Sequence, residues 1–378
     1  MKKSLFLTTA LVAAGFMTLG ATDVAAAGKK GKMGITGTYK ALAGYAKQQG
    51  AFENLQTGTS RNSYNTIDFK TDSEVHFKAS HVTDGGLKVG VFVELETDQA
   101  STATIDGSGV TIGGGFGTVM IGNAAHAAAI MNVNAPGVGA VGLTGPDLAA
   151  WVIAPAAVAM GAAGTSIGGR DDMKLRWVSS SFSGFTIGGG YTPSQTSGNN
   201  MAVNGGNAGT EVSVVDGAIK YSGKMGGSTV AANYAMWSTD AGTASVDGWS
   251  AGASTTFGAF TVGASYKDVD STGKTAAGVS VSTTSTSASE EAVGVGAVWK
   301  QGKMQLSLGY FNSSMPRATA TAGDDEATKW VLGADYAMGP GVNFVGTVAS
   351  VKWDDEANTN TANNNKGVAV IGGVKIAF

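Results

Sequence analysis

The sequence contains no cysteine, and this absence excludes several kinds of protein at once. Without thiols the chain cannot form disulfide bonds, carry out thiol catalysis or bind zinc through sulfur. Charged residues make up only 14% of the chain, against roughly 25% in a typical soluble domain. The net charge of −3 leaves no strongly positive surface for nucleic acid, so we expect no nucleic-acid partner.

Proline is scarce, with 6 residues, whereas glycine is abundant, with 58 of 378. Because the glycines follow no three-residue period, they do not indicate collagen. An aromatic content of 8% and the low charge also exclude a disordered chain. A chain of this length built from small residues must bury its apolar surface by some means other than a thick hydrophobic core.

The N-terminus has the pattern of an export signal. Lys2 and Lys3 are followed by an apolar run from Leu5 to Leu19 and by the small residues 25–27. We therefore predict a signal peptide over residues 1–27 and a mature barrel domain over residues 28–378. The alternative is an N-terminal membrane anchor, but the apolar run is short for a membrane span.

One later segment, residues 148–164, is apolar enough to be considered as a membrane helix. It is short, Pro155 interrupts it, and alanine and glycine dominate its composition. These residues insert into a bilayer more weakly than leucine and isoleucine. The sequence therefore does not predict a spanning helix.

Alternation of apolar and polar residues is the recurring pattern after residue 30. In residues 69–79, for example, Phe69, Val75 and Phe77 share one face and the charged residues share the other. Such a period of two indicates a strand with two different faces. We predict sixteen strands, at residues 32–46, 67–82, 87–97, 104–113, 117–122, 173–181, 185–191, 212–223, 228–237, 247–256, 260–269, 292–300, 304–312, 328–338, 342–353 and 367–378.

Short glycine-rich turns alternate with longer connections along the chain, and every proline falls in a predicted connection. An even number of strands with this alternation is typical of a transmembrane antiparallel β-barrel. Lipid covers the apolar outer face of such a barrel, so no thick core is expected. A soluble β-sandwich or an autotransporter-like adhesin also uses many strands, but aromatic residues near the strand ends favour the barrel.

Three segments carry a family resemblance: SEVHFKASHVTDGGLKVGVFVELE (residues 73–96), GFGTVMIGN (residues 115–123) and the terminal GVKIAF. The chain resembles Gram-negative general porins of the alphaproteobacterial type over essentially its whole mature length. The resemblance implies a sixteen-stranded homotrimeric barrel, in contact with outer-membrane lipid, that passes small hydrophilic solutes and ions. Phe378 is similar to the terminal aromatic residue that directs assembly in that family.

Two motifs suggest enzymatic chemistry but lack the context that it needs. Residues 137–142 match a dinucleotide-binding fingerprint, yet prolines flank them where a strand and a helix should lie. Residues 164–168 match a nucleophile elbow, but all three histidines, His76, His81 and His126, precede the serine. We therefore expect no enzyme, no cofactor and no catalytic or metal-binding residue.

The connection over residues 123–172 is far longer than the others and is rich in alanine, glycine and valine. It lies between the fifth and sixth predicted strands, and connections of this length are commonly functional. The resemblance implies that it folds into the barrel and narrows the pore; the alternative is an exposed surface loop. Asp147 is its only acid before Asp171, fewer than the family commonly carries.

The predicted inner faces of the first strands and the inserted loop supply the candidate pore-lining and constriction residues. They are Lys40, Lys70, Asp72, Glu74, His76, Lys78, Glu94, Asp147, Lys174 and Arg176. Lys40 is similar to a basic wall position in the family, whereas Asp72 and Glu74 occupy positions where the family often has arginine. Each could instead be a solvated lumen residue without a role in selectivity.

Three functions remain open at this stage. The first is a water-filled channel for passive diffusion, selective by size at the constriction and by charge in the lumen. The others are a solute-selective channel, suggested by the apolar inserted loop, and a non-conducting barrel adhesin. The acidic segment over residues 354–365 could bind calcium or form an ordinary exposed loop.

Overall fold

The computed structural model describes residues 31–54, 63–97, 104–144, 147–155, 158, 164–168, 171–194, 213–240, 245–272, 287–315, 323–356 and 363–378. The predicted signal peptide, residues 1–27, lies outside the described residues. Among the residues that are described, no helix is long and apolar enough to cross a membrane.

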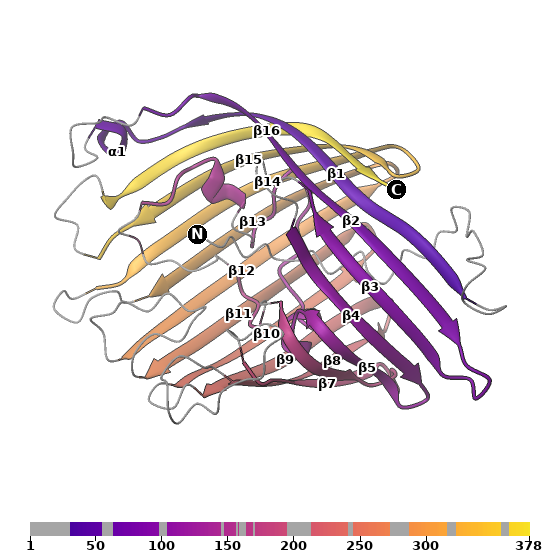
Figure 1. The fold of residues 1–378 in the computed structure, drawn as a ribbon. Coiled ribbons are helices and arrows are strands. Elements are labelled where there is room, and N and C mark those ends of the chain that lie inside the picture. The colour runs from indigo at the N-terminus through magenta and orange to yellow at the C-terminus, as the bar shows by residue number, and fades with distance from the viewer. Residues whose placement is uncertain are drawn as a thin grey trace.

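The described chain forms one closed barrel of antiparallel strands, in which each strand pairs with its sequence neighbours and β1 pairs with β16 (Figure 1). The strands are β1 (Lys32–Lys47), β2 (Ile67–Val82), β3 (Lys88–Glu96), β4 (Thr104–Gly114), β5 (Gly117–Ala124), β6 (Asp172–Val178), β7 (Phe185–Thr192), β8 (Ser213–Met225), β9 (Ser228–Asp240), β10 (Ser245–Phe257), β11 (Phe260–Thr272), β12 (Ser287–Gln301), β13 (Met304–Met315), β14 (Asp325–Gly339), β15 (Val342–Asp354) and β16 (Asn365–Ala377). Three short helical turns accompany them: α1 (Gly50–Asn54), α2 (Ala127–Ile130) and the 3-10 turn η1 (Asp147–Ala150).

The sixteen-stranded antiparallel barrel predicted from the sequence is confirmed. The sixth strand was predicted to reach residue 181, and this end was wrong because β6 stops at Val178. Beyond it, Ser183 and Gly184 both have positive φ, 50° and 86°, and close a tight turn between bridged residues Phe182 and Phe185. Paired positive φ values are typical of hairpin turns that match the twist of the sheet.

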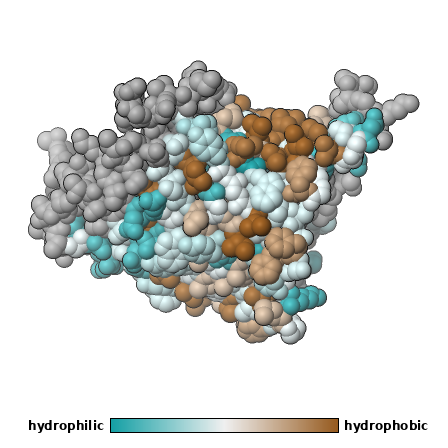
Figure 2. Space-filling view, turned by 90° about the horizontal axis from the view of Figure 1, so that it is seen from below, coloured by the Kyte–Doolittle hydropathy of each residue, from teal (hydrophilic) through white to brown (hydrophobic). Residues whose placement is uncertain are grey.

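Large apolar side chains cover much of the outer face of the barrel. Phe69 is 77% exposed and Leu308, Trp330 and Phe344 are each half exposed. Figure 2 shows brown apolar side chains gathered in patches over the face seen from below. These side chains gain nothing by exposure to water, so they are placed for contact with hydrocarbon.

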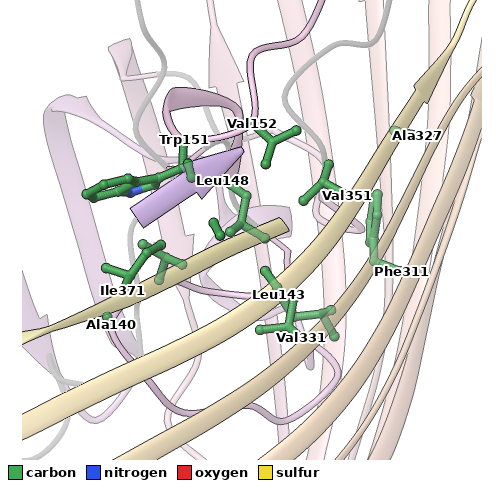
Figure 3. Close-up of a cluster of buried hydrophobic side chains, with 14 of the residues drawn as sticks. Ala140, Leu143, Leu148, Trp151, Val152, Phe311, Ala327, Val331, Val351 and Ile371 are labelled. Atoms are coloured by element: carbon green, nitrogen blue, oxygen red, sulfur yellow. The ribbon is translucent and has the colours of Figure 1, made fainter. Parts of the chain in front are cut away.

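The barrel also encloses an apolar cluster, formed where the connection between β5 and β6 packs against the inner wall. Leu148, Trp151 and Val152, from the connection between β5 and β6, are each at most 4% exposed. They pack with inward side chains of β13 to β16 and β1, including Phe311 and Ile371 (Figure 3). The connection thus supplies the apolar partner for the inward side chains of these strands.

Candidate pore constriction

The segment that joins β5 to β6, residues 125–171, is called the inserted segment below. Residues 126–142 form its first limb, which crosses the inner wall. The backbone N–H groups of this limb donate hydrogen bonds to side chains on several strands. The pairs are Ala128 to Asp216 (2.8 Å), Val133 to Asn233 (2.8 Å), Ala135 to Ser265 (3.1 Å), Val138 to Ser307 (3.0 Å), Gly139 to Asp335 (2.9 Å) and Ala140 to Thr347 (3.0 Å). The acceptors lie on β8, β9, β11, β13, β14 and β15, so the wall itself directs the path of this limb.

Residues 147–155 belong to the return limb of the inserted segment, and side chains of the wall hold this limb at its carbonyl groups. Trp353 Nε1 donates to the Val152 carbonyl oxygen at 3.0 Å, and Gln48 Nε2 donates to the Trp151 carbonyl oxygen at 2.7 Å. The Trp151 ring lies so close to Gly44 of β1 that an added Cβ there would stand 2.4 Å from it. Both polar and apolar contacts therefore fix this limb against β1, β15 and β16.

The root of the inserted segment is buried. His126 is fully buried, and its Nδ1 lies 3.1 Å from Asp216 Oδ1. Lys174 Nζ donates to the carbonyl oxygens of Ala124 and Asp172, and Arg176 donates to that of Ala125. Lys174 is only 2% exposed. Lys174 and Arg176 thus bind backbone carbonyl groups at the start of the inserted segment and at the end of β5.

The candidate residues on β1, β2 and β3 form a charged strip on one inner face. Lys40 Nζ lies 2.5 Å from Asp72 Oδ2. His76 lies between two carboxylates, with Nε2 at 3.0 Å from Glu74 and Nδ1 at 3.2 Å from Glu94. All five side chains are partly exposed, so the strip offers both signs of charge to a hydrated ion.

Three further candidates lie near this strip or on the segment. Lys70 forms an ion pair with Asp68 at 2.8 Å, and its ammonium stands 5.0 Å from the centre of the Trp151 ring. Lys78 is half-buried on β2, two residues beyond His76 on the same face. Asp147 begins η1 and is half-buried. Lys70 therefore connects the strip to the return limb of the inserted segment.

One group of carboxylates could hold a cation. Asp325 at the start of β14 and Asp355 and Glu356 after β15 bring oxygen atoms within 4.8 Å of one another. Burial and the hydrogen bond with Asp325 raise the pKa of Glu356 to about 7. The sequence indicated an acidic segment over residues 354–365 but not Asp325, which comes from another connection.

The model of the Gram-negative porin family matches residues 8–356. The chain belongs to the Gram-negative porin family. It is therefore an outer-membrane protein, and its lumen is a channel for passive diffusion.

Solved structures agree on the fold. An anion-selective porin from Comamonas acidovorans is 19% identical, with a TM-score of 0.59, over 92% of this chain and 100% of its own. The outer-membrane channel DcaP of Acinetobacter baumannii is 12% identical, with a TM-score of 0.62, over 95% and 100%. The trimer form of OmpT of Vibrio cholerae is 11% identical, with a TM-score of 0.57, over 92% and 100%. A search of curated proteins found no match to the sequence.

Sequence reasoning missed the acceptors that hold the inserted segment and several inward charges. The inward position of Lys375 could have been predicted from the sequence, because the alternation of β16 turns Val374 outward and Lys375 inward. Asn233 and Thr347 gave no such signal, since a small polar residue on an inner face looks the same whether it meets water or a backbone N–H group. Their role depends on contacts made across more than 100 residues.

Proposed function

We propose that small hydrophilic solutes and ions diffuse through this porin, and that the inserted segment forms the constriction that sets their upper size. The observation that carries the proposal is the series of hydrogen bonds from the first limb to six strands of the inner wall. A segment held in this way occupies a fixed part of the lumen. A sixteen-stranded barrel otherwise encloses a wide aqueous channel.

The decisive experiment compares the full chain with a variant that lacks residues 137–164. Both ends of this deletion meet at one side chain, because Ser265 Oγ lies 3.1 Å from Ala135 N and 2.7 Å from Thr165 Oγ1. The gap can therefore be closed without disturbing the strands. We expect higher single-channel conductance and passage of larger sugars. Unchanged conductance in a folded barrel would refute the constriction.

The same recordings test the two other functions. A solute-selective channel would be blocked by its solute, and an adhesin would not conduct. The structure favours the unselective channel, because the apolar residues that suggested a binding preference, such as Leu148 and Val152, are fully buried against the wall. The exposed residues of the first limb are Asn134, Gly137 and, further along, Gly142.

We also propose that the protein has no enzymatic activity and works as a homotrimer after removal of residues 1–27. The trimer form recorded for OmpT of Vibrio cholerae supports the oligomeric state. Ala41, Ala43 and Gly372 are small, exposed and adjacent on β1 and β16, which leaves room there for the side chains of another subunit. Native mass spectrometry would check the trimer, and the intact mass of the mature chain would check the removal of residues 1–27.

A further inference from the structure

The inner wall lacks side chains where the first limb of the inserted segment crosses three alternate strands. Gly252 lies on β10, Gly296 on β12 and Gly333 on β14. The neighbouring strands β9, β11, β13 and β15 supply hydrogen-bonding side chains described above, and β14 supplies Asp335, two residues after Gly333. Glycines and hydrogen-bonding side chains are thus interspersed on the wall along the path of this limb.

The three glycines touch the backbone of the inserted segment directly. A Cβ added at Gly252 would stand 1.7 Å from the Val133 carbonyl oxygen. At Gly296 it would stand 2.2 Å from the Pro136 carbonyl oxygen, and at Gly333 it would stand 1.7 Å from that of Val138. No two heavy atoms that are not bonded approach so closely, so any other residue would displace the segment.

The backbone conformation does not demand glycine at these positions. None of the three is among the residues with positive φ, so each adopts a conformation open to every residue type. Glycine inside a strand weakens it and often marks a place where another backbone approaches closely. The space taken by the inserted segment is the feature of these positions that requires glycine.

We propose that Gly252, Gly296 and Gly333, here called the glycine track, determine the width of the pore and hence the largest hydrated ion or sugar that passes. The inference rests on the proposed function, because it assumes that the inserted segment bounds the aqueous path. The track lets the first limb lie against the wall without an intervening side chain. If side chains stood at these three positions, the limb would lie further into the lumen and narrow the path that is open to solutes.

The effect of a single methyl group follows from the contact distances. An ordinary contact needs at least 3.4 Å, whereas the added Cβ at Gly333 would stand 1.7 Å from the Val138 oxygen, so the limb must move by 3.4 − 1.7 = 1.7 Å. Anchors on both sides, Asn233 and Thr347, hold the limb to the wall. The displaced part therefore bulges into the lumen instead of leaving the wall.

The experiment records single-channel conductance and liposome uptake of sugars of increasing size for Gly252→Ala and Gly333→Ala. We expect conductance to fall on the order of 1.5- to 2-fold, since the shift exceeds the radius of a water molecule, ~1.4 Å. The matched control is Gly34→Ala, also on an inner strand face, where an added Cβ meets nothing within 4 Å. It should conduct like the wild type.

A second comparison separates the track from general effects on the barrel. In the variant that lacks residues 137–164, Val138 is absent, so Gly333→Ala should no longer change conductance. Heat-modifiable migration on gels identifies folded barrels in every variant. Unchanged or increased conductance in folded Gly333→Ala, an equal fall in Gly34→Ala, or a fall that persists after the deletion would each overturn the inference. A wild-type protein that does not conduct would instead refute the proposed function.

Discussion

The pair of Lys40 and Asp72 offers the sharpest test of how lumen charge acts. Their charged atoms are 2.5 Å apart, and the side chains are 18% and 26% exposed. At the distance of a passing ion the two charges largely cancel. Lys40→Gln removes the positive charge and leaves Asp72 uncompensated, so we expect the channel to shift towards cations.

The size of the shift follows from Coulomb's law. A unit charge about 6 Å from an ion in water changes its energy by ~0.7 kcal/mol. The sign is opposite for a cation and an anion, so the difference between them is about 1.4 kcal/mol, which is roughly tenfold in their permeability ratio. Salt with a Debye length of ~10 Å reduces this, and we expect a shift of about three- to tenfold.

The assay is the reversal potential across a bilayer in a potassium chloride gradient. The chain offers its own control, because Asp72→Asn leaves Lys40 uncompensated and should shift the potential in the opposite direction. The double variant Lys40→Gln/Asp72→Asn should return close to the wild-type value. If both single variants shift the potential in the same direction, or neither does, the pair does not line the path of the ions.

The remaining predictions concern the inserted segment, assembly and pH. Trp151→Ala should weaken docking of the return limb by about 3–5 kcal/mol and increase open-channel noise, whereas Trp151→Phe should restore much of the quiet behaviour; equal noise in all three proteins would contradict this. Deletion of Phe378, whose backbone exchanges hydrogen bonds of 2.8 and 3.0 Å with Gly37, should lower the amount of folded outer-membrane protein without changing conductance, and normal amounts would speak against it. Because the pKa of Glu356 is raised to about 7, the fold favours its protonated form, and stability should fall as pH rises from about 4.5 through 7. Glu356→Gln should remove this pH dependence of the thermal midpoint, and a dependence that persists would place its cause elsewhere.

The strands were predictable because each one satisfies two local requirements. β2 runs from Ile67 to Val82, as the alternation predicts, since one face meets hydrocarbon and the other meets water. β12 begins at Ser287, five residues before the predicted start. Four of its first five residues, SASEE, are polar, so no apolar face shows that the hydrogen-bonded ladder continues there.

The candidate site was predictable only where pairing follows from a short turn. His76 and Glu94 belong to strands joined by the turn at residues 83–87, and the register brings them opposite each other. Lys40 and Asp72 are also directly opposite, but a connection of nineteen residues (48–66) separates their strands, so the sequence alone could not fix the register. Burial of Lys174 was beyond prediction, because the root of the inserted segment covers it.

The position of the inserted segment is encoded more in the wall than in the segment itself. Within its described residues the regular structure is four residues of α2 and four of η1, too little to fix a path. The wall supplies both the acceptor side chains and the glycine track along the path of the first limb. Since glycine weakens the strands that carry it, part of the unusual glycine content reflects the fit between wall and segment. The small residues that the composition displays are therefore as much a feature of the pore as the charges that line it.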